Sequence, residues 1–453
     1  MCSFNYHLYK KILLFFISFL FLSVSTSFST KDLLSLYQMA RESDPLLKKA
    51  VSALEATLEQ KPLTRSTLLP KLQAQMGQGY YGKKITGLGP LEIKRDYWGD
   101  DYSIRLIQPI FNAQAYVSLK MADHSIDAKR AELLAEEQRL IKKVAIAYFN
   151  LLDARAAVVV SKNRLKLIKE VLDRANAFLE AGMGDVLSVK EAKARYYAAK
   201  AGVVNAENAL SLSKENLSIL VHAPVSEVAD IGKFEIVGPK PDDVKKWIKA
   251  ALENQPILKS AQEGLLVAEK KIEYERRARW PKIDLEAMAG YADGLFLPDV
   301  IYREAHGVLR FTIPIYLGGS ISSKTAIAEK EAISARHNLS FLKDVIILQT
   351  KRAFLRLKDS ISIIQAAKQA LDSAKVSLKA TKKGYEIGTR DVIELLDMTD
   401  KYIEAKQGLF HAIYNHLKAR VELKAAAGLL GEGDIISLNG LLKDGGGVEI
   451  WER

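Results

Sequence analysis

The sequence contains an internal duplication, and this feature limits the fold of the chain more strongly than any other. Residues of the first half reappear in the second half in the same order, at an offset of 206 positions. The clearest matched pairs are Gly182 and Gly388, Asp185 and Asp391, Val186 and Val392, and Gly202 and Gly408. A repeat of about 200 residues is too long for one unit of a solenoid. We therefore expect two structurally equivalent halves, and pseudo-symmetry in whatever they build.

Each half contains a long stretch without proline or glycine, at residues 114–181 and 320–383. An ordinary globular helix has about 11 residues, whereas each of these stretches predicts a helix of about 100 Å. Apolar and small side chains recur at alternating spacings of four and three residues, as at Leu140, Val144 and Ala147. This spacing is the periodicity of coiled coils, and it continues over many turns.

Glycine-containing turns separate each long helix from a return helix that is rich in small residues. Glycine accepts the positive φ that ends a helix, so we expect two antiparallel helical hairpins, at about 113–221 and 319–428. An isolated hairpin of this length buries only a narrow stripe of side chains, and we therefore expect oligomerisation. The expected tip turns contain Gly182, Met183 and Gly184 in the first hairpin and Gly388, Thr389 and Arg390 in the second.

Two segments, at about 71–108 and 282–313, alternate apolar and polar residues, as at Ile283, Leu285 and Ala287. A period of two predicts half-buried strands, and we expect four strands of about ten residues, two in each half. Such strands fit a transmembrane β-barrel, although an ordinary soluble hairpin is the alternative. Because eight strands is the smallest usual barrel, several chains must pool their strands, and a trimer would supply twelve.

The beginning of the chain has the pattern of an export signal. Lys10 and Lys11 precede an apolar run at residues 12–22, and small residues follow. The run is too short to span a hydrocarbon core of about 30 Å comfortably, which disfavours a membrane anchor. No later stretch is apolar for long enough to be a transmembrane helix. The expected organisation is a signal peptide at 1–29, a first repeat at 30–225, a second repeat at 226–430 and a flexible glycine-rich tail at 431–453.

The sequence gives no sign of catalysis or of a nucleic-acid partner. The formal net charge is +12, but Lys and Arg are scattered among Glu along the helices rather than clustered. Cys2, the only cysteine, lies before the apolar run, so the mature chain has no disulfide and no thiolate metal site. There is no nucleophile elbow, phosphate loop or Cys/His cluster. We expect neither an enzyme nor a cofactor or metal site.

In combination, these motifs resemble the TolC family of outer-membrane efflux proteins, over about residues 31–430. The resemblance rests on the duplicated order of proline, two strands, proline and long helix. It rests also on the segments Ile-Pro-Ile-Tyr-Leu-Gly-Gly at 313–319 and Tyr-Glu-Ile-Gly-Thr-Arg at 385–390. The implied fold is an α+β membrane protein: a homotrimer with a twelve-stranded β-barrel, four strands per chain. The barrel lies in the cell outer membrane and continues into a long antiparallel α-helical coiled-coil barrel in the periplasm.

The resemblance also implies a function and partners. The function is the exit duct of a tripartite efflux or type I secretion system. The partners are a periplasmic adaptor (a membrane fusion protein), an inner-membrane pump of the RND or ABC type, and outer-membrane lipid. A non-conducting periplasmic coiled-coil scaffold or adaptor, built from similar hairpins, is the alternative.

Finally, the resemblance assigns roles near the second turn. Tyr385 and Arg390 match residues that tie the inner coiled coil shut, and Glu394 and Asp397 match acidic rings at the tunnel entrance. Carboxylates repeated around an axis favour cations, but solvated acids favoured by the helix dipole are the alternative reading. Ser188 stands where similar proteins often carry an acid that Tyr385 bonds. The hairpin tips are the expected docking surface for the adaptor.

Overall fold

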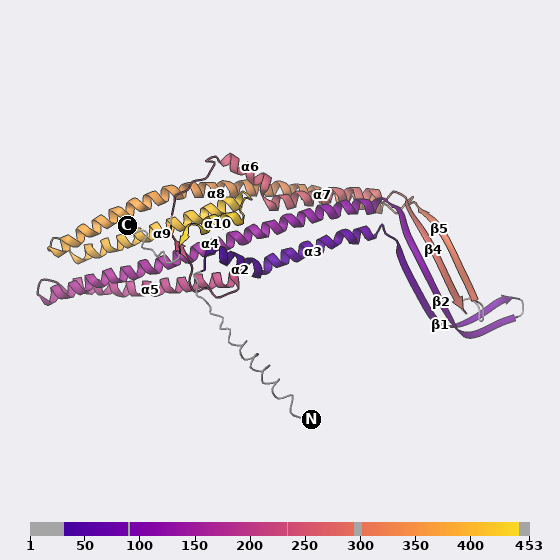
Figure 1. Cartoon of the computed structure of the whole chain (residues 1–453), viewed down its shortest axis with the longest axis horizontal. Coiled ribbons are helices and arrows are strands. Elements are labelled where there is room, and N and C mark those ends of the chain that lie inside the picture. The colour runs from indigo at the N-terminus through magenta and orange to yellow at the C-terminus, as the bar shows by residue number, and fades with distance from the viewer. Residues whose placement is uncertain (1–30, 89–90, 233, 294–300, 444–453) are drawn as a thin grey trace, which may run out of the picture.

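The computed structural model describes residues 31–88, 91–232, 234–293 and 301–443. The expected signal peptide therefore lies outside the described residues. Within them, the chain is a long, narrow molecule with a sheet at one end and helical hairpin tips at the other (Figure 1). Two strands, a long helix and a return helix follow one another twice along the chain.

The elements of the first succession are β1 (Lys71–Leu88), β2 (Leu91–Asn112), α4 (Ala113–Glu180) and α5 (Val186–Val221). Those of the second are β4 (Lys282–Asp293), β5 (Ile301–Thr312), α8 (Ser320–Glu386) and α9 (Val392–Ala426). The long helices α4 and α8 have 68 and 67 residues, which confirms the prediction from the absence of proline and glycine. Shorter elements precede each succession: α2 (Leu33–Ser43) and α3 (Pro45–Ser66) before the first, and β3 (Asp230–Ile231), α6 (Val244–Asn254) and α7 (Pro256–Arg277) before the second.

Glycine reverses the chain at both tips, as expected. Gly182 has a φ of 74° and Gly388 a φ of 76°, a left-handed conformation that side chains with a Cβ rarely adopt. An aspartate then opens each return helix, because its carboxylate accepts a backbone N–H of the first turn. Asp185 accepts from Ser188 and Asp391 from Glu394. The duplicated Gly and Asp thus have the same structural role twice.

The four long strands form one antiparallel sheet in the order β1-β2-β4-β5. The strands β4 and β5 have 12 residues each, close to the expected ten. The expectation is wrong for β1 and β2, which have 18 and 22 residues. The pairing of β2 with β4 stops at Asp100, but β1 and β2 remain paired beyond it, and their hairpin projects past the sheet (Figure 1). Cross-strand aromatic pairs account for this extension, since Tyr80 lies 5.3 Å from Trp98 between ring centroids.

The two faces of the sheet differ in chemistry. The registers place one set of exposed apolar side chains on a common face: Leu72, Met76, Ile104, Leu285, Leu309 and Phe311. The other face carries Gln73, Arg105, Glu286 and Arg310. Arg310 donates two hydrogen bonds to Glu286, at 2.9 and 2.8 Å. The alternation seen in the sequence therefore separates an apolar from a polar surface.

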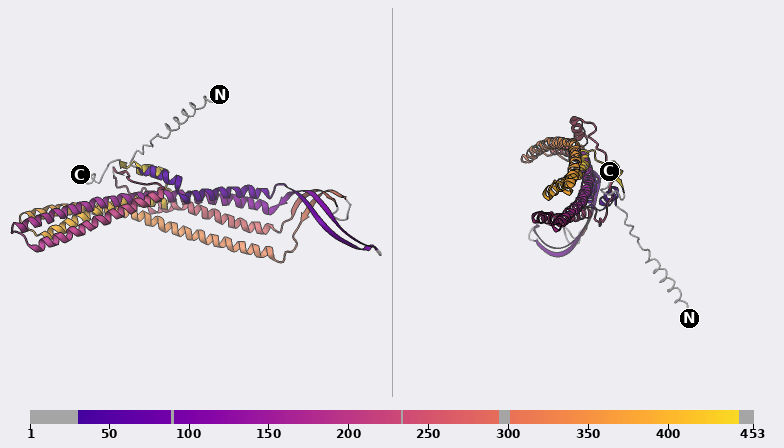
Figure 2. Two further views of the ribbon diagram at one scale, coloured as in Figure 1. Left: turned by 90° about the horizontal axis from the view of Figure 1, so that it is seen from below. Right: turned by 90° about the vertical axis from the view of Figure 1, so that its left-hand side faces the viewer.

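The long helices lie side by side as a curved layer. Helix α4 is central: it contacts α3 and α5 on one side and α7 and α9 on the other. Helix α8 contacts α7 and α9 and forms one edge of the layer, while α3 and α5 form the opposite edge. Viewed from the tips, the layer is concave on one side, and the short helices α2 and α6 lie on its convex side (Figure 2).

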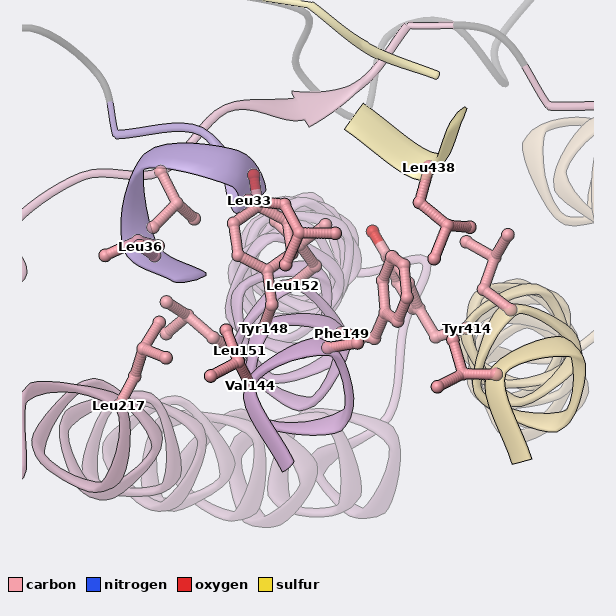
Figure 3. Close-up of a cluster of buried hydrophobic side chains, with 14 of the residues drawn as sticks. Leu33, Leu36, Val144, Tyr148, Phe149, Leu151, Leu152, Leu217, Tyr414 and Leu438 are labelled. Atoms are coloured by element: carbon pink, nitrogen blue, oxygen red, sulfur yellow. The ribbon is translucent and has the colours of Figure 1, made fainter. Parts of the chain in front are cut away.

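The main core lies at mid-length, where α2 crosses α4. Leu33 and Leu36 of α2 pack on Tyr148 and Leu152 of α4, with Leu217 of α5 below them (Figure 3). All five side chains are buried. The Tyr148 hydroxyl donates to the Ala229 carbonyl oxygen at 2.5 Å, which satisfies the polar atom of this buried ring.

Helix α4 also contains one stretch that is long and apolar enough to cross a membrane, so the expectation that no later stretch reaches this length is wrong. Half of that stretch is buried inside the chain. Because the buried side chains of α4 include Val144, Tyr148 and Phe149 of the main core, we interpret the stretch as a core helix.

The expectation of a flexible tail from residue 431 is wrong for its first part. Helix α10 (Glu432–Asn439) and strand β6 (Leu442–Lys443) follow at once, and β6 pairs with β3. Ile435 and Leu438 of α10 enter the main core, 0% and 5% exposed. Their spacing of three residues gives this short helix an apolar face. The high glycine content around the helix led to the incorrect prediction of a flexible tail. Residues 444–453 lie outside the described part.

We predict that Ile435→Ala destabilises the folded chain by about 2–5 kcal/mol, because it leaves a cavity in the core. Ile436→Ala is the matched control, since Ile436 is 54% exposed. Thermal unfolding of detergent-solubilised protein measures the difference. Equal melting temperatures for the two variants would show that α10 does not stabilise the core.

Candidate gate at the hairpin tips

The two hairpin tips lie beside each other and enclose a groove of about 460 Å³. Gly184 of the first turn lies close to the backbone of α4, because a Cβ at this position would lie 2.8 Å from the Leu179 nitrogen. This close approach requires glycine. Met183 is 74% exposed at the end of its turn. In the second turn, the Thr389 N–H and hydroxyl both donate to the Gly384 carbonyl. The second turn is therefore held by hydrogen bonds to its own backbone, while exposed side chains such as Met183 and Ile387 remain accessible to a partner.

Tyr385 is buried between the hairpins rather than hydrogen-bonded to Ser188. It is 7% exposed, and its ring lies 5.5 Å from the ring of Phe178 between centroids. Burial raises the pKa of the Tyr385 phenol. The Ser188 hydroxyl donates instead to the Asp185 carboxylate, at 2.6 Å. Within one chain, Tyr385 thus joins the hairpins by packing.

Arg390 and Glu394 form an ion pair within α9 and its turn. The Arg390 Nη1 lies 3.1 Å from the Glu394 Oε1, and both side chains are about half exposed (57% and 45%). A pair at this spacing on an exposed helix surface contributes only about 0.3–0.5 kcal/mol. Arg390 therefore does not close the tips by itself within a single chain.

Asp397 belongs to a larger ion network that connects the two hairpins. Arg195 of α5 donates to Asp397 at 2.8 Å, to Asp400 at 2.7 Å and to Glu191 at 3.1 Å. Arg164 of α4 donates to the other oxygen of Asp400, at 2.9 Å. Burial alone would lower the pKa of Arg195, but the hydrogen bonds to Asp400, Glu191 and Asp397 raise it above its usual value. The guanidinium thus stays charged and holds α5 against α9.

A second ion pair lies nearer the tips. Arg174 of α4 donates to Glu386 of α8 at 2.6 Å. This hydrogen bond lowers the pKa of the Glu386 carboxyl. Sequence analysis missed Arg164, Arg174, Arg195, Asp400 and Glu386, because each partner comes from the other hairpin. The only local signal was the i,i+4 spacing of Glu191 and Arg195.

Asp397 lies on the concave side of the helical layer, and Glu394 precedes it by about one helical turn. Asp397 is separated by two heptads from His411, which bonds Asp153 and lines an open groove. Residues seven apart share a helix face, and the opposite face of α9, with Ile413, packs into the main core, which includes Leu438 of α10. The two carboxylates are about half exposed, at 45% and 47%. Both are paired with arginine within the chain, which reduces the field that each projects.

The comparisons with known proteins agree with this architecture. The model of the outer membrane efflux protein family matches residues 36–221 and 247–429, and so includes both hairpins and both pairs of strands. The chain belongs to this family. Its members are outer-membrane efflux channels, so the chain is an outer-membrane exit duct and not an enzyme.

Individual relatives extend over nearly the whole chain. Outer membrane protein TolC of Escherichia coli is 28% identical over 446 residues, which cover 96% of this chain and 89% of the relative. Alkaline protease secretion protein AprF of Pseudomonas aeruginosa is 25% identical, with 89% and 85% covered. The crystal structure of the CmeC outer membrane channel of Campylobacter jejuni superposes with a TM-score of 0.76 over 91% of this chain and 90% of that chain. At 17% identity this likeness concerns the fold alone.

We predict that Arg195→Gln loosens the tips of this efflux-family channel. The loss leaves Asp397 and Asp400 adjacent without their shared cation, at a cost on the order of 1 kcal/mol after solvent screening. The ratio of open to closed channels should rise about fivefold, as measured by single-channel recording in planar bilayers. Lys193→Gln, at an exposed position of the same helix, is the control. An unchanged open probability in folded Arg195→Gln channels would contradict a closing role for the network.

Proposed function

We propose that three copies of the chain form one continuous tunnel, with a twelve-stranded barrel in the outer membrane and a helical barrel in the periplasm. The observation that carries the proposal is that each chain has two complementary open edges. In the described sheet, β1 and β5 are the outer strands, and unpaired strand edges are unfavourable, above all in lipid. Pairing of β5 with β1 of the next chain would be antiparallel and would close the barrel.

The chemistry of the two sheet faces supports this arrangement. A barrel in a membrane needs an apolar outer face and a polar lumen. The face with Leu72, Met76 and Phe311 is apolar, and these side chains are 62–77% exposed. The face with Arg310 and Glu286 is polar. We place the first face against lipid and the second in the lumen.

The helical layer has matching edges. Large apolar side chains, 45–69% exposed, follow the open side of α8: Ile327, Phe341, Leu348, Leu355, Ile363 and Val376. A second set, 38–67% exposed, follows the opposite edge on α3 and α5: Val51, Leu58, Tyr197, Val204, Leu212 and Ile219. Spacings near seven residues in both sets are typical of coiled-coil seams. We propose that the α8 edge of one chain packs on the α3 and α5 edge of the next.

This seam predicts a charge-swap experiment. Ile219 lies 33 residues after Val186 and Leu355 lies 31 residues before Glu386, so both are at a similar height above the tips. Leu355→Lys should abolish stable trimers, because it places a charge in an apolar seam. Ile219→Glu in the same chain should restore them, since each interface then carries a Lys and a Glu. Cross-linking and gel mobility of the membrane fraction measure the oligomer. Stable trimers of Leu355→Lys alone would contradict the seam.

We propose further that the tunnel serves a tripartite efflux or type I secretion system. The relatives that support this are outer membrane protein TolC and AprF, whose name assigns it to alkaline protease secretion. The adaptor would dock on the tips at Gly182, Met183, Gly184, Gly388, Thr389 and Arg390, with an RND or ABC pump beneath. Conductance of the purified oligomer in planar bilayers tests the duct. A non-conducting oligomer would favour a scaffold.

At the entrance, we propose that Glu394 and Asp397 of three chains form acidic rings, and that Tyr385 and Arg390 restrain the closed state. The support is the position of Asp397 on the concave side, one helical turn from Glu394, and the burial of Tyr385 between the hairpins. The pairing with Arg390 and Arg195 makes the closed ring a ring of ion pairs. Separation of the hairpins would release Asp397 from Arg195, so the open entrance is expected to be more negative than the closed one.

The double variant Glu394→Ala/Asp397→Ala tests the acidic rings. We predict that block by a trivalent cation weakens on the order of tenfold and that cation selectivity falls, while trimers still assemble. Assembly should persist because neither residue is buried. Reversal potentials and cation titrations in planar bilayers provide the measurement, with Glu253→Ala on α6 as a control outside the concave surface. Unchanged selectivity in assembled double-variant trimers would mean that these acids are ordinary surface charges.

A further inference from the structure

A groove of about 500 Å³ lies between α4 and α8 at mid-length. It covers the junction where α9 ends and α7 begins, and its lining includes Gln255 and Ala426 at that junction. Its walls carry four cationic side chains: Arg139 and Lys142 from α4, and Arg352 and Arg356 from α8. The groove is therefore built from both halves of the duplicated chain.

The charges in this groove do not cancel. Two carboxylates, Glu136 and Glu422, also line it. Arg139 donates to Glu136 at 2.6 Å, and Arg356 donates to Glu422 at 2.6 Å. Lys142 and Arg352 form no ion pair with any of the residues that the structure describes. Four cations against two carboxylates leave an excess of two positive charges in each chain, and three chains would triple it.

The groove opens on the concave side of the helical layer. On α8, Phe354 and Leu357 pack with Trp247 of α6, which lies on the convex side (Figure 2). Arg352 and Arg356 are each two residues from Phe354, which places them about 200° around the helix. On α4, Arg139 is likewise two residues from Ile141, which is buried in the main core, so their side chains are also about 200° apart around the helix. Arg139, Arg352 and Arg356 therefore point away from the convex side, and Lys142 lines the same groove.

We propose that this groove is an anion-binding subsite on the tunnel wall, for carboxylate or phosphate groups of the exported cargo. The proposal rests on the proposed duct, because that assembly makes the concave side the tunnel wall. Planar guanidinium groups bind carboxylate and phosphate through paired hydrogen bonds. A concave groove with an excess of positive charge also raises the local concentration of anionic ligands. Cargo would leave the acidic entrance and meet a basic belt at mid-tunnel.

The test uses pyrophosphate as the anion and two readouts on the full chain. In planar bilayers, pyrophosphate should block the channels of the wild-type protein reversibly. The double variant Lys142→Gln/Arg352→Gln should weaken this block about tenfold or more. These two residues were chosen because neither Glu136 nor Glu422 loses a partner in the variant. The control Lys246→Gln/Lys368→Gln removes the same charge from exposed positions on α6 and α8, both outside the groove, and should block like the wild type.

Isothermal titration of pyrophosphate into detergent-solubilised protein gives the second readout, which does not depend on conduction. Saturable binding that is lost in Lys142→Gln/Arg352→Gln and kept in the control supports the subsite. Equal binding in both variants, or no binding to the wild type, overturns it. Channels that never conduct would instead contradict the proposed duct, and the titration would still decide the groove.

Discussion

The structure depends on one constraint: a single chain cannot cover both edges of its own layers. Apolar side chains follow the outer side of α8, and a second set follows α3 and α5 on the opposite edge. The sheet has the same problem, since β1 and β5 are its outer strands. One contact between neighbouring chains could cover both kinds of edge, because each open helical edge lies on the same side of the molecule as an open strand edge. A repeated contact between two different edges generates a ring if the rotation closes. In the proposed trimer, the curvature of the layer would make its concave side the lumen.

Much of this architecture could be predicted from the sequence, because it depends on local rules that are repeated. The absence of proline and glycine predicted α4 and α8 nearly to the residue. The glycines at 182 and 388 predicted the reversals, since a positive φ is a property of a single residue. Alternation predicted four strands and the two chemical faces of the sheet. The lengths of β1 and β2 were wrong, because their aromatic pairing continues into a segment where charged residues interrupt the alternation.

The parts that sequence reasoning missed all depend on contacts between distant segments. Arg195 looks like a helix-surface charge until α9 brings Asp397 and Asp400 beside it. The basic groove combines two residues near position 140 with two near position 354, so a scan for clustered charge finds nothing. Helix α10 is short and surrounded by glycine, and only its burial against the core identifies it as a folded element. The duplication explains why such contacts recur, but not which side chains form them.

Stability is distributed unevenly along the molecule, and this distribution suits the proposed opening at the hairpin tips. The mid-length core joins α2, α4, α5, α9 and α10 through large buried side chains such as Tyr148 and Leu417. Toward the tips, the hydrophobic cluster is smaller and includes small residues such as Ala192 and Ala199. There the hairpins are joined by this smaller cluster together with partly exposed ion pairs, and each such pair contributes about 0–1 kcal/mol. Core contacts cost several kcal/mol to break, so the hairpins should separate at the tips while the mid-length core stays closed. In the proposed trimer, an adaptor bound at the tips would then need to supply only the energy of the ion network and of the small cluster that includes Tyr385, without disturbing the proposed seam above.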